Sequence, residues 1–373
     1  MVISNIKIVL ENRIIKNGYL VFENGLIKSV GEGKYDGEAI DGKGLIAMPG
    51  FIDIHIHGSC GIDFMDATEK DYETIANSLY SEGVTTFLAT TLTSDNESLK
   101  RVCKTVNNVK KDIPSLTGIH FEGPYINKLY KGAQNEKYIR NPDIKEFDEL
   151  QKISGNNVKY ITLAPENEDA MEFISHVSKN GVTVSAGHSN ATFDDVRLAI
   201  KNGLTNVTHM HNAMSGHHHR KPGIVTAGFY FDELYTEFIC DTIHVCRDVL
   251  EMSYKVIGPD RFVIITDALK AKHSDLKEFE LFGLPCEKRD GAAYLKTGPL
   301  AGSLLTMDQG VRNMREITGA ALYELANISS RNAAKSMHLY DRGIIQVGNL
   351  ADIVLLDESL NVKETYKLGK RVF

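Results

Sequence analysis

The sequence predicts an α/β protein: a distorted (β/α)8 barrel of the TIM type, with a small β-sandwich domain formed by both chain ends. Eight short apolar runs alternate with helical patterns through the middle of the 373-residue chain, and both ends have a strand-rich texture instead. Eight strands joined mostly by helices are typical of a parallel barrel. The predicted small domain covers 1–48 and 343–373, and the predicted barrel covers 49–342.

The two chain ends have the features of paired strands. Glu23-Asn24-Gly25 is a strong hairpin signal, because asparagine and glycine accept the positive φ angles of such turns. The segments around this turn alternate or are rich in β-forming residues. Strands are expected over Ile6–Leu10, Gly18–Glu23 and Leu26–Val30, and near the other end over Gly343–Gly348, Ala351–Leu356 and Lys363–Phe373.

The middle of the chain supplies the barrel. Its apolar runs are 51–56, 85–90, 116–121, 158–164, 182–187, 205–210, 237–243 and 262–266. Helical patterns lie over Glu69–Ser81, Asp95–Lys110, Asp169–Lys179, Phe193–Lys201 and Arg247–Ile257. The 213–236 connection is irregular, and the chain after 268 reads as a long loop until helices resume near 306. These two segments predict the distortion of the barrel.

Charge and composition exclude several classes of partner. The net charge of −7 argues against nucleic acid and anionic membranes, which select basic surfaces. No apolar stretch approaches the roughly 18 residues of a membrane span, and the first residues lack the features of a signal peptide. The five cysteines form no CxxC pair, so a disulfide framework is not expected. We expect a cytoplasmic protein that binds neither nucleic acid nor membrane.

Metal-ligating residue types stand at the carboxyl ends of the predicted strands, where such a barrel carries its chemistry. His55 and His57 lie two residues apart and therefore share one face of a strand. The other candidates at strand ends are Glu122, His188, His209 and Asp267. Together the six predict a metal site, and their number suits two divalent ions that share one carboxylate. Glu122 is the natural bridge, because its strand lies between the two histidine groups.

Two alternatives to this set of ligands can be examined in the sequence. His120 shares the face of Glu122 and could compete as a ligand, but we expect it to support a ligand instead. A bridge made by a modified lysine at the end of the fourth strand is excluded. That strand ends in Leu163-Ala-Pro-Glu166, and Lys159 lies near its beginning.

With these residues identified, the sequence resembles the amidohydrolase superfamily, and within it the family of N-acetylglucosamine-6-phosphate deacetylases. The resemblance covers nearly the whole chain. Its Glu-Gly-Pro, His-Asn-Ala-Met and Leu-Ala-Gly-Ser segments are far more specific than the HxH motif. The matching motifs are PGFIDIHIHG (49–58), GIDFMDA (61–67), HFEGPYIN (120–127), LAPE (163–166), AGHSNA (186–191), THMHNAM (208–214), HHRKPG (218–223), CDTIHV (240–245), TDA (266–268) and LAGSLLTMD (300–308).

The resemblance implies a role for each matching residue. Asp267 matches the catalytic aspartate, and His244 matches a histidine that contacts the substrate and helps to polarise the acetamide carbonyl. Some members lack the first-strand histidines and use one metal, so His55 and His57 imply that a second ion can be bound here. The residues implied to hold the common metal are Glu122, His188 and His209, and those implied to hold the sugar phosphate are Asn212, Ala213 and Arg220, with His219 beside the arginine.

Two departures from the family pattern stand out. His211 occupies a position where an aromatic residue is common, and we retain His209 as the ligand because it directly follows Thr208 in the motif. The run at 217–221 has an extra histidine and a lysine beside Arg220, whose planar guanidinium suits phosphate. In this family that loop can reach the neighbouring subunit, so the resemblance implies a homodimer. The roles of His120, His211, His217 and His218 stay open.

The implied reaction converts N-acetylglucosamine 6-phosphate and water to glucosamine 6-phosphate and acetate, in amino-sugar catabolism or cell-wall recycling. Asp267 would act as base and then as acid. One or two divalent ions serve as cofactor, with zinc preferred over iron, manganese and cobalt.

Several other functions compete with this one. An N-acetylgalactosamine-6-phosphate deacetylase differs only at a C4 epimer that motifs do not reveal. Other amidohydrolases, such as a D-aminoacylase, a cyclic amidase or an adenine deaminase, lack support from the His-Asn-Ala-Met segment. A sugar-phosphate sensor without catalytic activity would be expected to lose Asp267 or the metal ligands, and this chain retains them.

Overall fold

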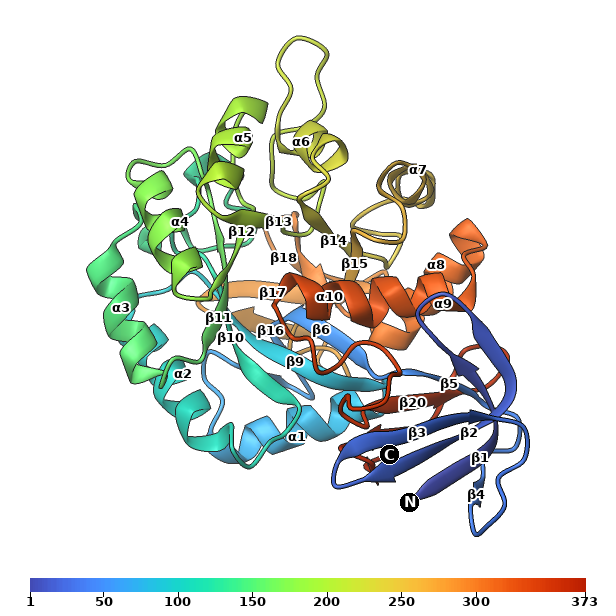
Figure 1. Ribbon diagram of the computed structural model, residues 1–373. Helices are drawn as coiled ribbons and strands as arrows, with labels where there is room; N and C mark the ends of the chain where they lie inside the picture. Colours follow the sequence, from blue (N-terminus) through green and yellow to red (C-terminus); the bar gives the residue numbers. More distant parts are fainter.

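The computed structural model describes residues 1–373 and has a barrel of eight parallel strands at its centre (Figure 1). The strands follow one another around the barrel in chain order, and each neighbouring pair is parallel. The first and last strands meet without a ladder, at a seam bridged between Ile56 and Ala268. The predicted barrel is therefore confirmed. Its strands are β6 (Phe51–Ile56), β9 (Val84–Thr91), β10 (Leu116–Glu122), β11 (Val158–Leu163), β12 (Thr183–Ala186), β13 (Leu204–Val207), β14 (Tyr235–Ile239) and β15 (Phe262–Ile265).

Helices surround the barrel and connect its strands (Figure 1). Side-chain caps fix the first turns of two of them: Asp95 accepts a hydrogen bond from the Ser98 amide, and Asp143 accepts two in the same way. The helices are α1 (Glu69–Tyr80), α2 (Asn96–Val109), α3 (Ile144–Ile153), α4 (Ala170–Lys179), α5 (Phe193–Lys201), α6 (Ile224–Tyr230), α7 (Arg247–Ile257) and α8 (Met307–Thr318). Shorter elements are η1 (Lys128–Tyr130), η2 (Glu136–Tyr138), α9 (Leu322–Ala326), η3 (Asn327–Arg331) and α10 (Asn332–Ser336).

Side chains inside the barrel divide it into an apolar end and a polar end. Ile52, Ile54, Val263 and Ile265 belong to one buried apolar cluster with residues of α10 and the following turn. The polar side chains of the strand ends lie beyond this cluster. The barrel is therefore a packed core that presents chemistry at one end only.

Both chain ends join in one eight-stranded sheet, and both termini lie in it (Figure 1). Asn24 and Gly25 have φ angles of 53° and 80°, so the predicted hairpin is confirmed. Leu26, in an edge strand of this sheet, forms an isolated bridge with Leu350 near the other end of the chain. A cluster of 13 buried apolar residues forms the core of this domain. Its strands are β1 (Val2–Val9), β2 (Ile14–Glu23), β3 (Leu26–Glu32), β4 (Ile40–Asp41), β5 (Ile46–Pro49), β20 (Ile353–Leu356), β21 (Val362–Lys367) and β22 (Lys370–Arg371).

Two expectations about the secondary structure are wrong. No strand forms over Gly343–Gly348, because the two glycines take φ angles of 84° and 91° and turn the chain. The segment after 268 is not a loop but carries an antiparallel four-stranded sheet. Its strands are short and mix charged with apolar residues, so no long apolar run announces them: β16 (Glu278–Leu281), β17 (Leu284–Arg289), β18 (Ala292–Leu295) and β19 (Leu300–Ser303).

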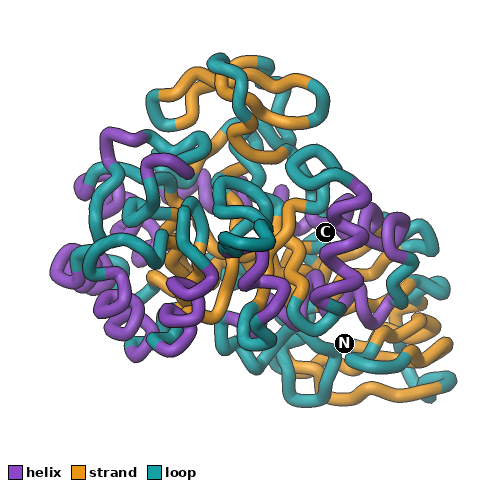
Figure 2. Tube along the Cα trace, turned by 90° about the horizontal axis from the view of Figure 1, so that it is seen from above, coloured by secondary structure: helices purple, strands orange, loops and turns teal.

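The four-stranded sheet lies over the barrel. The labels β16, β17 and β18 fall over the middle of the barrel in Figure 1, and Figure 2 shows a group of strands standing beyond it. A two-stranded ribbon of β7 (Gly58–Ser59) and β8 (Ile62–Asp63) follows β6. None of the helices combines the length and the apolar character that crossing a bilayer requires.

Candidate metal centre

The six metal-ligand residue types lie together at the carboxyl ends of the barrel strands. Glu122 is the last residue of β10, and His55 and His57 lie at the end of β6. The other three each stand two residues beyond a strand, with positive φ angles: His188 after β12 at 49°, His209 after β13 at 29° and Asp267 after β15 at 49°. Such backbone conformations are rare for residues other than glycine and cluster at functional sites.

The first of two groups consists of Glu122, His188 and His209. Oε1 of Glu122 lies 3.0 Å from Nε2 of His188 and 3.1 Å from Nε2 of His209, and the two nitrogens are 3.0 Å apart. Three buried donor atoms thus converge on one point. Nδ1 of His188 donates to the carbonyl oxygen of Tyr130 at 2.9 Å, which leaves Nε2 free to face the group.

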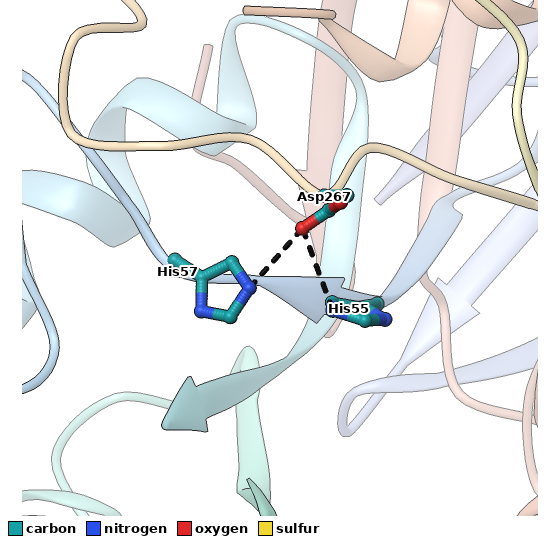
Figure 3. Close-up of side chains that lie close together, drawn as sticks. All are labelled: His55, His57 and Asp267. Carbon is teal, nitrogen blue, oxygen red and sulfur yellow. Dashed lines mark ion pairs between the residues drawn. The ribbon is translucent and has the colours of Figure 1, made fainter. Parts of the chain in front are cut away.

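The second group consists of His55, His57 and Asp267 (Figure 3). Oδ1 of Asp267 lies 3.1 Å from Nε2 of His57 and 3.5 Å from Nε2 of His55. Glu122 lies between the groups, because its Oε2 is 3.3 Å from Nε2 of His57 while its Oε1 faces the first group. One carboxylate therefore contacts both groups.

The two carboxylates make the centre strongly attractive to positive charge. Burial lowers the pKa of His57, but the contacts with Asp267 and Glu122 outweigh it and raise that pKa to about 9. Burial likewise raises the pKa of Glu122, while the charge of His55 and the hydrogen bonds from His188 and His209 hold it well below its ordinary value. These contacts favour the protonated form of His57 and the ionised form of Glu122.

These residues fit a divalent metal. Nε2 of His55 is fully buried and makes no hydrogen bond, although an unpartnered buried nitrogen is costly. Four imidazoles and two carboxylates supply nitrogen and oxygen donors, which suit zinc and the neighbouring transition metals. The residues of either group could hold one ion.

A cavity of about 210 Å³ opens onto the centre. Gln134 lines it and was not predicted: its Nε2 donates to Oε2 of Glu122 at 2.5 Å, while its Oε1 accepts from the Thr93 amide at 2.7 Å. Residues of β16 and β19 close one side of the cavity, where the sequence predicted only a loop. The lining residues are His57, Leu92, Glu122, Gly132, Ala133, Gln134, His188, His209, Asn212, Ala213, His244, Asp267, Leu281, Leu300, Ala301 and Gly302.

His244 reaches this cavity from the loop after β14. Asp241 holds it, because Oδ2 of Asp241 accepts from Nδ1 of His244 at 2.6 Å and Oδ1 accepts from the His244 amide at 2.8 Å. Burial lowers the pKa of His244, but the hydrogen bond and the charge of Asp241 raise it above the ordinary value. The second ring nitrogen is left for a ligand in the cavity.

The predicted phosphate residues divide into two places. Asn212 and Ala213 line the cavity, but Arg220 and His219 are exposed and do not. Nη1 of Arg220 lies 2.6 Å from Nε2 of His219, and the arginine lines a separate hollow with Arg197. Within one chain, the arginine loop is therefore apart from the centre.

The remaining histidines have partners of their own. Nε2 of His120 lies 2.8 Å from Oγ1 of Thr162 and its Nδ1 lies 3.1 Å from the Ile54 carbonyl oxygen, so the ring sits beside the centre without joining it. His211 turns away and faces Oγ of Ser253 at 3.0 Å. His217 faces Thr226 at 3.0 Å, and Nδ1 of His218 accepts from the Arg220 and Lys221 amides, each at 3.1 Å.

Comparison with known families agrees with this arrangement. Residues 46–372 match the Amidohydrolase family. The chain belongs to this family. The resemblance inferred from the sequence motifs is thereby confirmed.

Within the family, the similar proteins are named as deacetylases of phosphorylated N-acetyl sugars. An N-acetylglucosamine-6-phosphate deacetylase of Lysinibacillus sphaericus is 40% identical over 336 residues, covering 89% of this chain and 87% of the relative. An N-acetylgalactosamine-6-phosphate deacetylase of Escherichia coli O157:H7 is 33% identical, covering 87% of each protein. The solved N-acetylglucosamine-6-phosphate deacetylase of Thermotoga maritima is 39% identical, with a TM-score of 0.92 and coverage of 100% of this chain and 99% of the other.

Proposed function

We propose that this amidohydrolase removes the acetyl group of N-acetylglucosamine 6-phosphate, giving glucosamine 6-phosphate and acetate. The observation that carries the proposal is the six-residue centre with Asp267 and His244 both facing one cavity. The names of the relatives and of the Thermotoga maritima structure support the substrate.

We assign one divalent ion to each of the two groups of the centre. Glu122, His188 and His209 would hold one ion, and His55, His57 and Asp267 would hold a second, with Glu122 shared between them. Zinc is the preferred ion, with iron, manganese and cobalt as alternatives. A divalent ion held there lowers the pKa of water toward about 7 and polarises the amide carbonyl.

Asp267 is the proposed general base and acid. Its carboxylate takes a proton from the attacking water as the hydroxyl adds to the acetyl carbon. As the carbon–nitrogen bond breaks, the same proton passes from Asp267 to the departing amine. Burial raises the pKa of Asp267, but the charges of His55 and His57 hold it below its ordinary value, so the group begins as a base.

His244 is the proposed donor to the acetyl oxygen. Its Nδ1 is engaged by Asp241, so a proton on Nε2 can stabilise the negative charge that develops on that oxygen. Asn212 and Ala213 would bind the sugar phosphate from the cavity wall. Arg220, with His219 beside it, would complete the phosphate site from the neighbouring subunit of a homodimer.

The deciding experiment is acetate release from N-acetylglucosamine 6-phosphate by metal-stripped protein, resupplied with each ion in turn. We expect no acetate without metal and recovery with zinc or one of the alternative ions. Absence of acetate with every ion would refute the proposal, and it would favour a sensor if the sugar phosphate still bound.

A second candidate substrate is N-acetylgalactosamine 6-phosphate, favoured by the Escherichia coli relative of that name. The two sugars differ only at C4, so kcat/KM for each epimer under the same conditions separates them. We expect the glucosamine substrate to be preferred.

We also place the protein in the cytoplasm. All five cysteines are unpaired, which suits a reducing compartment.

A further inference from the structure

Glu237 is a buried carboxylate that the proposed mechanism does not use. It lies in the middle of β14 and is 0% exposed. No lysine or arginine forms an ion pair with it, and its only ion-pair partner is His55. A buried carboxylate without a compensating partner is strongly unfavourable. The contacts that Glu237 makes must therefore stabilise its negative charge.

The two oxygens of Glu237 are used differently. Oε1 accepts a hydrogen bond from the hydroxyl of Tyr160 on β11. Oε2 accepts from Nδ1 of His55 at 3.4 Å. The Tyr160 hydroxyl holds the carboxylate from one side, so that its other oxygen faces the imidazole.

This contact decides which nitrogen of His55 faces the centre. A hydrogen bond at Nδ1 fixes the orientation of the imidazole ring and leaves its other nitrogen toward the centre. Nε2 of His55 is that nitrogen, and it lies 3.4 Å from Oε1 of Glu122 and 3.5 Å from Oδ1 of Asp267. Glu237 thus orients the ring so that the unpartnered Nε2 faces the centre.

The other three histidines of the centre lack such a partner. Nδ1 of His188 has a neutral carbonyl oxygen, and Nδ1 of His57 and of His209 makes no hydrogen bond. An anionic partner raises the basicity of an imidazole more than a carbonyl does. His55 is therefore the ligand with the strongest support, and it belongs to the second group.

We infer that Glu237 is the positioning residue of His55 and controls how tightly the ion of the His55–His57–Asp267 group is held. This inference rests on the proposed metal centre. Glu237 would act through the imidazole and would have no effect of its own on the ion of the first group.

Equilibrium dialysis of the metal-stripped full chain against zinc tests it. We expect wild type to bind two ions, and Glu237→Gln to bind the second roughly 10- to 100-fold more weakly with the first unchanged. Glutamine keeps the shape of the side chain and removes its charge. The same substitution in a His55→Asn background should not change the binding of the remaining ion.

Tyr160→Phe serves as the second variant if Glu237→Gln does not fold. It removes only the hydroxyl that orients the carboxylate, so it should weaken the second ion less, by about threefold, and leave the first unchanged. Cobalt absorption spectra of the same proteins report the loss at one site independently of activity.

Three results would overturn the inference: unchanged binding of both ions in Glu237→Gln, an equal loss of both ions, or a wild-type protein that binds a single ion. Failure of the proposed function is seen separately. A wild-type protein that binds two ions but releases no acetate would refute the deacetylase and leave the role of Glu237 standing.

Discussion

His57 and Asp267 come from the two strands that close the barrel, and Nε2 of His57 lies 3.1 Å from Oδ1 of Asp267 (Figure 3). Isolated backbone hydrogen bonds hold the seam beside them. In one of these, the Asp267 amide donates to the His55 carbonyl oxygen at 2.8 Å. Oδ2 of Asp53 accepts from the Thr266 hydroxyl at 2.6 Å, one residue before the aspartate. The seam thus fixes the proposed base against the second group.

Asp267→Asn should retain the ion of the first group and lose turnover. An amide cannot accept the proton of water, so we expect kcat to fall by about 10²- to 10⁴-fold with little change in KM. Steady-state kinetics and metal content of the same preparation measure both effects. Near-normal kcat would remove Asp267 from the acid–base role.

His209→Phe and His211→Phe form a matched pair. Only His209 faces Glu122, whereas His211 faces Ser253 on α7. We expect His209→Phe to abolish binding of the first ion. His211→Phe should leave metal content unchanged and lower the free energy of unfolding by about 1 kcal/mol, the usual contribution of one hydrogen bond. Loss of metal from His211→Phe would contradict the ligand assignment.

The sequence was sufficient to predict the barrel and the convergence of the six centre residues. Strand periodicity puts His55 and His57 on one face, and parallel strands bring their carboxyl ends together, so the topology alone gathers the remaining candidates. Both rules act over any sequence separation. Neither depends on the details of side-chain packing.

The parts that escaped prediction depend on contacts between distant segments. Gln134 lies in a loop, and only the fold shows that its amide meets Glu122. Glu237 sits inside an apolar run, where its charge gives no hint of the His55 ring across the barrel. The sheet of β16–β19 pairs short, polar strands with one another, and such strands have no periodic pattern of their own.

Glu82→Gln should destabilise the protein strongly. Glu82 is 2% exposed, and its Oε1 lies 2.7 Å from Nζ of the buried Lys272, while its Oε2 accepts from the Met307 amide at the start of α8. Losing one partner of a buried ion pair leaves the other charge uncompensated, so we expect a loss of about 3 to 5 kcal/mol in urea unfolding. Glu251→Gln, which removes one partner of an exposed pair, is the control and should leave the midpoint unchanged.

The effect of Glu82→Gln should depend on pH. Burial raises the pKa of Glu82, but the charge of Lys272 and its hydrogen bonds hold it below the ordinary value of 4.5. A lowered pKa adds stability above pH 4.5 that is lost as the pH falls through the folded-state value. Wild type and variant should therefore differ most near neutral pH and converge in acid. A gap that persists unchanged below pH 4.5 would show that the charge of Glu82 is not its cause.

Arg220→Ala tests whether the arginine binds the phosphate of the sugar. A phosphate bound by a guanidinium gains charge-assisted hydrogen bonds of about 1.5 to 3 kcal/mol, so we expect KM for the phosphorylated sugar to rise by roughly 10- to 100-fold. KM for an unphosphorylated analogue should not change. Lys221→Ala, the adjacent cation, is the control and should have a smaller effect.

Co-expression of Arg220→Ala with Asp267→Asn decides between the two positions of the loop. If Arg220 acts across a dimer, one site of the mixed dimer combines Asp267 of the first chain with Arg220 of the second. We then expect more activity at low substrate concentration than the two variants show separately. If Arg220 acts within its own chain, every site of the mixed dimer lacks one of the two groups, and activity does not recover.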